Sequence, residues 1–274
     1  MRGTIHVLTP DDALTLRRWV QPAIDRQAGS NPTIRPARGV PVADVVAQTR
    51  RLLSEGPLPV RDLGRRLAQR FPDAPATALA HVARERVALV QLPPRGLWQR
   101  SGGVVYQTVE HHLGRPAVEV DLAALVRRYL AVFGPATAAD MTTWSRVTRL
   151  GPVLSSLRDG LVEVECDDGV RRYDVPGAPY ADADEPAPVR LLGGYDNLWL
   201  SHADRRHVLD DEARSLWAGP DGGVGNAVFV DGFMAGLWWW RRDRVDLETF
   251  RSLSRAEEAG LQEEVGRVEG LLTR

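Results

Sequence analysis

The stretch Gly-Pro-Leu-Pro-Val-Arg-Asp-Leu at residues 56–63 has a counterpart in Gly-Pro-Ala-Thr-Ala-Ala-Asp-Met at residues 134–141. Each comes after an apolar stretch with helical spacing, at residues 44–54 and 122–133. Gly frees the backbone after a helix and Pro cannot extend one, so each pair ends its helix. A second helix is expected after a short turn. The match indicates that one folding unit occurs twice in the chain.

The segments after the two copies also agree. In the first copy we expect helices at residues 60–70 and 76–86, a turn at 94–96, and strands at 88–92, through Trp98 and at 104–109. In the second copy we expect helices at 138–145 and 150–158 and strands at 161–166 and 170–175. The Asp-Gly pair at 168–169 is a strong hairpin signal between two alternating runs. This order predicts two winged helices, in which the third helix suits the major groove of DNA and the hairpin lies beside it.

The two ends of the chain differ from the repeat. Residues 3–8 alternate as in a strand, and Thr9 then caps a helix that has a proline and two acids in its first turn. After a proline-rich linker near residue 179 we expect strands at 189–200, 225–233 and 234–240. Ser254 and Glu257 form a capping box for a closing helix. Its apolar stripe comprises Leu261, Val265, Val268, Leu271 and Leu272.

These patterns predict the α+β fold class, with tandem winged-helix domains followed by a β-rich, small barrel-like C-terminal domain. The expected domains are a remnant of a first winged-helix unit at 1–40, winged helices at 41–118 and 119–178, and the β-rich domain with its C-terminal helix at 179–274. The lone strand expected at the chain start has nothing obvious to pair with, so we expect the first unit to lack its beginning.

Charge is distributed unevenly. The net charge of −1 argues against a simple basic protein that coats DNA. However, residues 1–120 carry +7, residues 121–178 carry −1 and residues 179–274 carry −7. A basic N-terminal part can attract phosphate while the acidic part faces elsewhere, although such asymmetry also arises on ordinary solvated surface. No apolar run or signal segment predicts a membrane location. The single cysteine, Cys166, excludes an internal disulfide and suits a reducing cytoplasm.

Segments spread along the chain resemble a known family. They are RGTIH at 2–6, LPPRGLW at 92–98, FGPAT at 133–137, YDN at 195–197 and SHADR at 201–205. Together they resemble the bacterial winged-helix family that includes the AlkZ and YcaQ DNA glycosylases. The resemblance implies tandem winged helices with a β-barrel and duplex DNA as ligand. It also implies excision of alkylated purines and unhooking of interstrand crosslinks in at least some members.

The family's catalytic motif is missing from this sequence. In the family, two glutamines, or a glutamine and an acid, flank one apolar residue upstream of the Arg-Gly-Thr strand. Neither Gln91-Leu92-Pro93 nor Gln107-Thr108-Val109 fits that pattern, and no other triplet does. Cleavage of a glycosidic bond needs an oriented water or a carboxylate/amide pair beside a displaced nucleotide. We therefore assign no catalytic residue and expect this form to be inactive as a glycosylase. Either the start codon lies further upstream or the chemistry has been lost.

Arginines on the third helices and hairpins are the candidate DNA-binding residues. They are Arg84, Arg86, Arg95 and Arg100 in the first copy and Arg146, Arg149, Arg158, Arg171 and Arg172 in the second. Arginine can neutralise a phosphate or bind guanine O6 and N7 with a fork of two hydrogen bonds. Exposed arginines also occur on solvated faces without a function. The hairpin acids Glu163, Glu165, Asp167 and Asp168 would repel phosphate, which favours the first copy.

Several other polar or aromatic residues have both a possible functional role and a structural one. Arg2, Thr4 and His6 are candidate pocket-lining residues, although an inward histidine on a strand is more often simply hydrogen-bonded. Ser201, His202 and Asp204 are too close in sequence for a hydrolytic triad and are expected to fix a turn. The pair His111-His112 has no further ligands at metal spacing, so we expect no metal and no cofactor. Tryptophans 238–240 are expected to fill a core rather than stack on bases.

The function that these features favour is binding of duplex DNA by a glycosylase-like protein. Two alternatives stay open. A transcriptional regulator would read paired half-sites as a dimer, and a protein-interaction scaffold would use winged helices without touching DNA. We expect a cytoplasmic protein associated with the nucleoid and without a membrane partner, and the sequence leaves its oligomeric state open.

Overall fold

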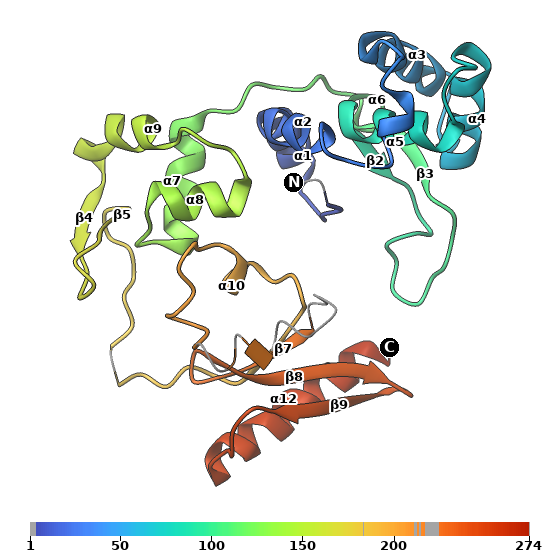
Figure 1. Ribbon diagram of the computed structural model, residues 1–274. Coiled ribbons are helices and arrows are strands. Elements are labelled where there is room, and N and C mark those ends of the chain that lie inside the picture. Colours follow the sequence, from blue (N-terminus) through green and yellow to red (C-terminus); the bar gives the residue numbers. More distant parts are fainter. Residues whose placement is uncertain (1–3, 183, 211–212, 214, 217–224, 274) are drawn as a thin grey trace. The chain divides into compact units, whose positions relative to one another are not determined.

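The chain folds into two units of helices and antiparallel sheets. The structure, a computed structural model, describes residues 4–182, 184–210, 213, 215–216 and 225–273. Unit 1 comprises Met1–Leu125 with Ser145–Thr148, and unit 2 comprises Val126–Trp144 with Arg149–Arg274. Figure 1 labels the elements of each. Their mixture of helices and sheets confirms the expected α+β class.

Unit 1 is built around three helices and a small sheet. Its elements are α1 (Pro10–Trp19), α2 (Gln21–Ala28), the 3₁₀ helix η1 (Arg35–Ala37), α3 (Val42–Ser54), β1 (Leu58–Pro59), α4 (Val60–Arg70), α5 (Ala76–Arg86), β2 (Leu89–Gln91), β3 (Val105–Thr108) and α6 (Val109–Leu113). The sheet is antiparallel with β3 in the middle. Leu63 and Leu67 of α4 and Leu79 of α5 are fully buried in the core formed by α3, α4 and α5. Burying one such side chain contributes about 1.5–3 kcal/mol. Helices α4 and α5 have the predicted bounds.

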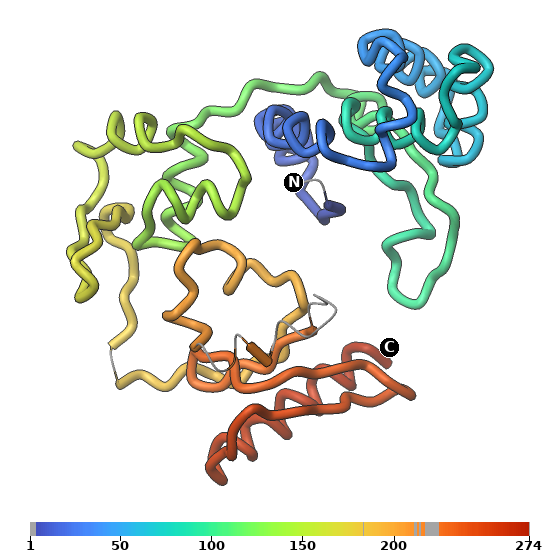
Figure 2. The backbone as a smooth tube through the Cα atoms, viewed as in Figure 1, coloured from blue at the N-terminus to red at the C-terminus, as the bar shows by residue number. Residues whose placement is uncertain are grey.

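Two strands expected in unit 1 are absent from the residues that the structure describes. Residues 4–9 form no strand, because no neighbouring strand offers hydrogen bonds to them. Thr9 does cap α1 as predicted, since its hydroxyl accepts a hydrogen bond from the backbone N of Asp12. Trp98 lies in a turn rather than a strand, because both edges of β3 are already paired with β1 and β2. Figure 2 traces residues 92–104 as a long excursion between β2 and β3.

The second copy of the repeat lies mostly in unit 2. Its elements are α7 (Leu122–Phe133), α8 (Ala138–Ser145), α9 (Gly151–Ser156), the 3₁₀ helix η2 (Arg158–Gly160), β4 (Val162–Glu165) and β5 (Arg171–Asp174). Strands β4 and β5 pair as the predicted hairpin. Ala136 pairs with Tyr173 of β5, as Leu58 pairs with Tyr106 of β3 in the first copy. The repeat seen in the sequence therefore includes the strand pairing.

The C-terminal part of unit 2 is a sheet covered on both faces. Its elements are β6 (Arg190–Leu192), α10 (Asn197–Leu200), β7 (Asn226–Val230), β8 (Phe233–Arg241), β9 (Arg244–Thr249) and α12 (Arg255–Leu272). In the described residues the strands pair in the open order β6-β7-β8-β9, without a pairing of β6 with β9 that would close them into a barrel. Helix α12 packs Leu261 against Val228 and Trp238, while Trp199 packs with Phe229 behind the sheet. Because both apolar faces are covered, burial needs no closure into a barrel.

Local capping decides several boundaries in this part. The expected strand at 189–200 ends after β6, because Asp196 accepts a hydrogen bond from the backbone N of Leu198 and begins α10 instead. The capping box of Ser254 and Glu257 is confirmed at the start of α12. Leu271 is 63% exposed and does not belong to the buried stripe of that helix.

Candidate nucleic-acid interface

Arg84 lies on the exposed side of α5, the third helix of the first copy. Its guanidinium donates a hydrogen bond of 2.8 Å to Nδ1 of His81, one turn earlier. Burial lowers the pKa of His81, and the charge of Arg84 lowers it further, so the ring is neutral at physiological pH and can accept this bond. A guanidinium has five N–H groups. Arg84 therefore keeps donors for a phosphate or a base edge.

Arg86, at the end of the same helix, is bound by another side chain of the protein. It forms an ion pair with Asp25 of α2 and is only 24% exposed. Arg17 and Gln21 donate hydrogen bonds of 2.8 and 3.0 Å to the carbonyl of Glu85. These contacts cover the C-terminal end of α5 with the N-terminal helices, so Arg86 is less accessible than Arg84. No local pattern indicates this, because the partners lie about sixty residues away in the chain.

The loop between β2 and β3 carries the other two candidates of the first copy. Arg95 and Arg100 are both exposed. Arg95 donates a hydrogen bond of 3.2 Å to the side chain of Gln91 at the base of the loop. Between them lie Leu97 and Trp98, which are 53% and 52% exposed. The loop thus presents two cations and two large apolar side chains to solvent.

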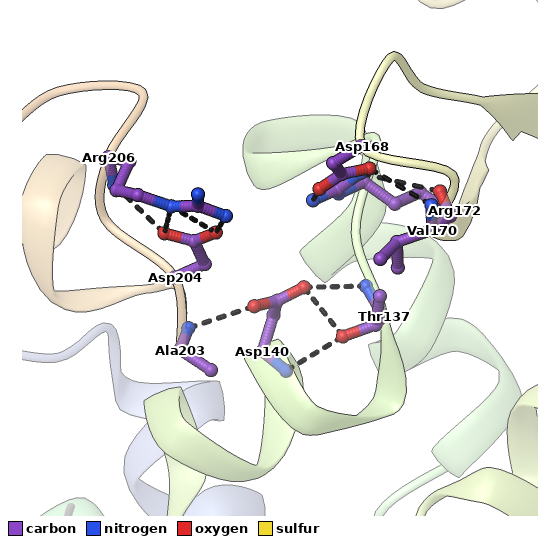
Figure 3. Close-up of polar contacts among 8 residues, drawn as sticks. All are labelled: Thr137, Asp140, Asp168, Val170, Arg172, Ala203, Asp204 and Arg206. Carbon is purple, nitrogen blue, oxygen red and sulfur yellow. Dashed lines mark hydrogen bonds and ion pairs between the residues drawn. The ribbon is translucent and has the colours of Figure 1, made fainter.

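Arginines on η2 and on the hairpin of the second copy pair with acids of that hairpin. Arg158 and Arg171 both pair with Glu163, at N–O distances of 3.0 and 3.3 Å. Arg172 donates two hydrogen bonds to Asp168, of 2.9 and 2.7 Å (Figure 3). These bonds hold the pKa of Asp168 below its ordinary value. Two of the four acids expected to repel phosphate therefore bind three of the arginines expected to attract it.

Arg146 and Arg149 lie in the segment between α8 and α9. Both are exposed, with φ angles of 64° and 65°. Non-glycine residues rarely adopt this left-handed conformation. The carbonyl of Arg146 accepts a hydrogen bond of 2.9 Å from Arg26. This bond involves the backbone of Arg146 and not its guanidinium.

Thr4 and His6, two of the three residues expected to line a pocket at the chain start, belong to the described residues. Arg2 lies outside the described residues. Nδ1 of His6 is 3.1 Å from the carbonyl oxygen of Thr4, which makes a local turn rather than a strand. A separate cavity of this unit, between α3 and α6, has a volume of about 400 Å³. It is lined by Arg50, Ser54, Thr108, Glu110, His111, Gly114, Arg115 and Pro116.

Ser201, His202 and Asp204 bind three different partners. The buried Ser201 accepts a hydrogen bond at its carbonyl from the Tyr129 hydroxyl, at 2.7 Å. Nε2 of His202 is 2.8 Å from the carbonyl of Phe133. Arg206 binds both carboxylate oxygens of Asp204 (Figure 3), which lowers the pKa of Asp204 to about 2. The backbone of Ser201 and the side chains of His202 and Asp204 therefore hold the 201–206 turn, and the three residues do not form a triad.

Asp140 is a residue of unit 2 whose importance the sequence analysis missed. It is only 5% exposed, and one carboxylate oxygen accepts hydrogen bonds of 2.8 and 2.7 Å from the backbone N and hydroxyl of Thr137. The other oxygen accepts a bond of 2.8 Å from the backbone N of Ala203 (Figure 3). Asp140 thereby joins the start of α8 to the 201–206 turn. The Thr-x-x-Asp spacing is a capping signal that the sequence already contained.

The described residues contain no cluster of metal ligands and no membrane-spanning helix. In the described ranges no three His, Cys, Asp or Glu side chains lie close enough together to hold a metal ion. Every helix in those ranges is too short or too polar to cross a bilayer.

Comparison with known proteins places the chain in a family. A family model described as DNA glycosylase AlkZ-like matches residues 1–271. Among solved structures, the DNA glycosylase AlkZ of Streptomyces sahachiroi superposes with a TM-score of 0.71 and 22% sequence identity. The match covers 98% of this chain and 78% of that one. At this identity it shows the fold alone. No curated protein sequence matched.

Proposed function

Since the chain belongs to the AlkZ-like family of DNA glycosylases, we propose that it binds duplex DNA through the first copy of its repeat, acting as a winged helix. The element order α3-β1-α4-α5-β2-β3 and the sheet order β1-β3-β2 support this proposal. In a winged helix the third helix, here α5, enters the major groove. The loop at 92–104 would then be the wing beside it.

The observation that carries the proposal is the set of exposed arginines in this copy. Arg84 lies on α5, and Arg95 and Arg100 lie on the wing. They belong to the part of the chain that carries +7. The hairpin arginines of the second copy are held by Glu163 and Asp168. Arginine at a phosphate displaces condensed counterions, so binding through the first copy should weaken steeply with salt.

The residues that bind DNA do not by themselves cleave a glycosidic bond. The glutamine pair that the family resemblance makes catalytic is absent from residues 1–274. Arginines that hold phosphate position the duplex but do not stabilise an oxocarbenium-like sugar. We therefore propose that these residues bind DNA without releasing a base. Incubation with an alkylated duplex, followed by chromatography of free bases, is expected to give no excised purine. Catalytic release of a purine would overturn this part of the proposal.

Neutralising the three arginines of the first copy is expected to abolish most of the DNA affinity. The variant Arg84→Gln/Arg95→Gln/Arg100→Gln removes up to three phosphate contacts. The slope of log K against log salt should then fall by about one for each lost contact, and the affinity at low salt by about 10- to 1000-fold. Fluorescence anisotropy with a labelled duplex across a salt series measures both quantities.

The matched control changes three arginines of the second copy. Because Glu163 and Asp168 already pair with them, and Glu165 and Asp167 add negative charge to the same hairpin, Arg158→Gln/Arg171→Gln/Arg172→Gln should alter the DNA affinity by less than about threefold. Circular dichroism checks that both triple variants are folded. Equal losses in the two variants would contradict the assignment to the first copy, and absence of binding by the unmodified protein at low salt would contradict DNA binding altogether.

A further inference from the structure

The wing exposes an aromatic side chain where burial would be expected. Among the tryptophans that the structure describes, Trp98 is the only one in the exposed class, at 52%. Leu97 beside it is 53% exposed. Leaving two large apolar side chains in water costs burial free energy that folding would otherwise gain. Two adjacent apolar side chains in the same loop offer a partner a continuous contact surface.

The tip that carries them is shaped by its own backbone contacts. The backbone N of Leu97 donates to the carbonyl of Pro94, and the backbone N of Arg100 donates to the carbonyl of Leu97, both at 3.2 Å. Gly102 lies so close to the Pro94 ring that a Cβ there would be 2.8 Å from Pro94 Cγ. The two sides of the loop therefore contact each other. Figure 1 shows the loop projecting away from the helices of unit 1. The apolar pair is thus held at the end of an ordered projection.

The charges around the pair indicate the kind of partner. Residues 92–104 contain Arg95 and Arg100 and no acid. The corresponding tip of the second copy has the opposite character, with Asp167 and Asp168 and no large aromatic. An apolar tip flanked by arginines is complementary to a nucleic acid strand, which offers base faces between phosphates. Indole stacks on any base, and leucine fills the space beside it.

We propose that Trp98 and Leu97 form a wedge that inserts into duplex DNA where a base has left the stack, while Arg95 and Arg100 bind the flanking phosphates. This rests on the proposed DNA binding and adds to it a preference for duplexes with an interrupted stack. An intact stack must be opened before insertion, which costs free energy, whereas a gap left by a missing base is already open. The wedge therefore recognises damaged or distorted duplex and not a particular base sequence.

The test compares two duplexes of the same sequence, one intact and one with a tetrahydrofuran abasic analogue at its centre. The wild-type protein is expected to bind the abasic duplex at least about 10-fold more tightly, within the range that one base–aromatic stack supplies. Trp98→Ala should lose that preference while keeping its affinity for the intact duplex within about threefold and its salt slope unchanged. Trp98→Phe should retain most of the preference, because phenylalanine can still stack.

A spectroscopic readout separates insertion from any structural effect. A 2-aminopurine placed next to the abasic analogue should change its fluorescence when Trp98 stacks on it, and Trp98→Ala should abolish the change. Tyr195→Ala is the matched control, since Tyr195 is an exposed aromatic of unit 2, at 74%. It should behave as wild type.

The outcomes distinguish the two proposals. Binding of both duplexes with equal affinity, or a 2-aminopurine signal that survives Trp98→Ala, would overturn the wedge and leave DNA binding intact. Absence of binding to either duplex at low salt would overturn the proposed function itself.

Discussion

Replacing Asp140 by alanine is expected to lower the free energy of unfolding of unit 2 by about 3–5 kcal/mol, because it removes three hydrogen bonds to a buried carboxylate. Two of the donors come from Thr137 and the third is the backbone N of Ala203. Once the buried carboxylate is gone, the backbone N–H groups at 137 and 203 lose this partner. Urea unfolding followed by tryptophan fluorescence measures the loss.

Two graded variants and one control make this test specific. Thr137→Val removes only the hydroxyl and should cost about 1 kcal/mol. Asp140→Asn keeps the shape of the side chain but turns an N–H₂ group toward donors, so its loss should fall between the two. Asp62 occupies the equivalent position in the first copy, where it forms an exposed ion pair with Arg65. Asp62→Ala should therefore cost less than about 1 kcal/mol. Equal losses for Asp62→Ala and Asp140→Ala would contradict the buried role of Asp140.

Gly134→Ala is expected to destabilise unit 2 by about 2–4 kcal/mol through overpacking. A Cβ at this position would lie 2.6 Å from both Asp174 Cγ and the carbonyl oxygen of Leu130. Asp174 is 1% exposed and is held by the backbone N of Val175 at 2.7 Å and the Tyr180 hydroxyl at 2.8 Å. Neither neighbour can move without breaking hydrogen bonds. The thermal unfolding midpoint and the urea midpoint should both fall.

Gly39→Ala is the control for this change. A Cβ at Gly39 meets nothing within 4 Å, so the substitution should alter stability by less than about 1 kcal/mol and stabilise if it has any effect. An unchanged unfolding midpoint for Gly134→Ala would contradict the close approach of Gly134 to Asp174.

The repeated helices could be predicted because their signals are local. Gly-Pro stops, capping residues and apolar periodicity act within a few residues, and the bounds of α4, α5, α7 and α8 agree with the expected ranges. The Asp-Gly hairpin and the capping box of α12 belong to the same class of signal. The expected strands that did not form depended either on a distant pairing partner or on a helix cap that the sequence analysis overlooked. Within the described residues no strand lies beside 4–9, and Asp196 turned an expected strand into α10.

The candidate site was predictable only in part. Arginine spacing identified the helix and wing positions, but it did not indicate which guanidiniums were already engaged. Arg86 pairs with Asp25, and Arg172 with Asp168. The second pair lies within one hairpin and could have been anticipated from the opposite charges four residues apart. The first depends on α2 packing against α5, which no local pattern encodes.

The sequence by itself determined that a helix-turn-helix-hairpin unit occurs twice, since the same Gly, Pro and Asp recur in the same order. Only the tertiary structure decided what those residues do. Gly56 is needed for its φ of 146°, whereas Gly134 is needed for the space that Asp174 occupies. Asp62 is partly exposed to solvent and Asp140 is buried. The physical reason is that backbone propensity acts between near neighbours, while burial and charge pairing depend on which segments pack against each residue.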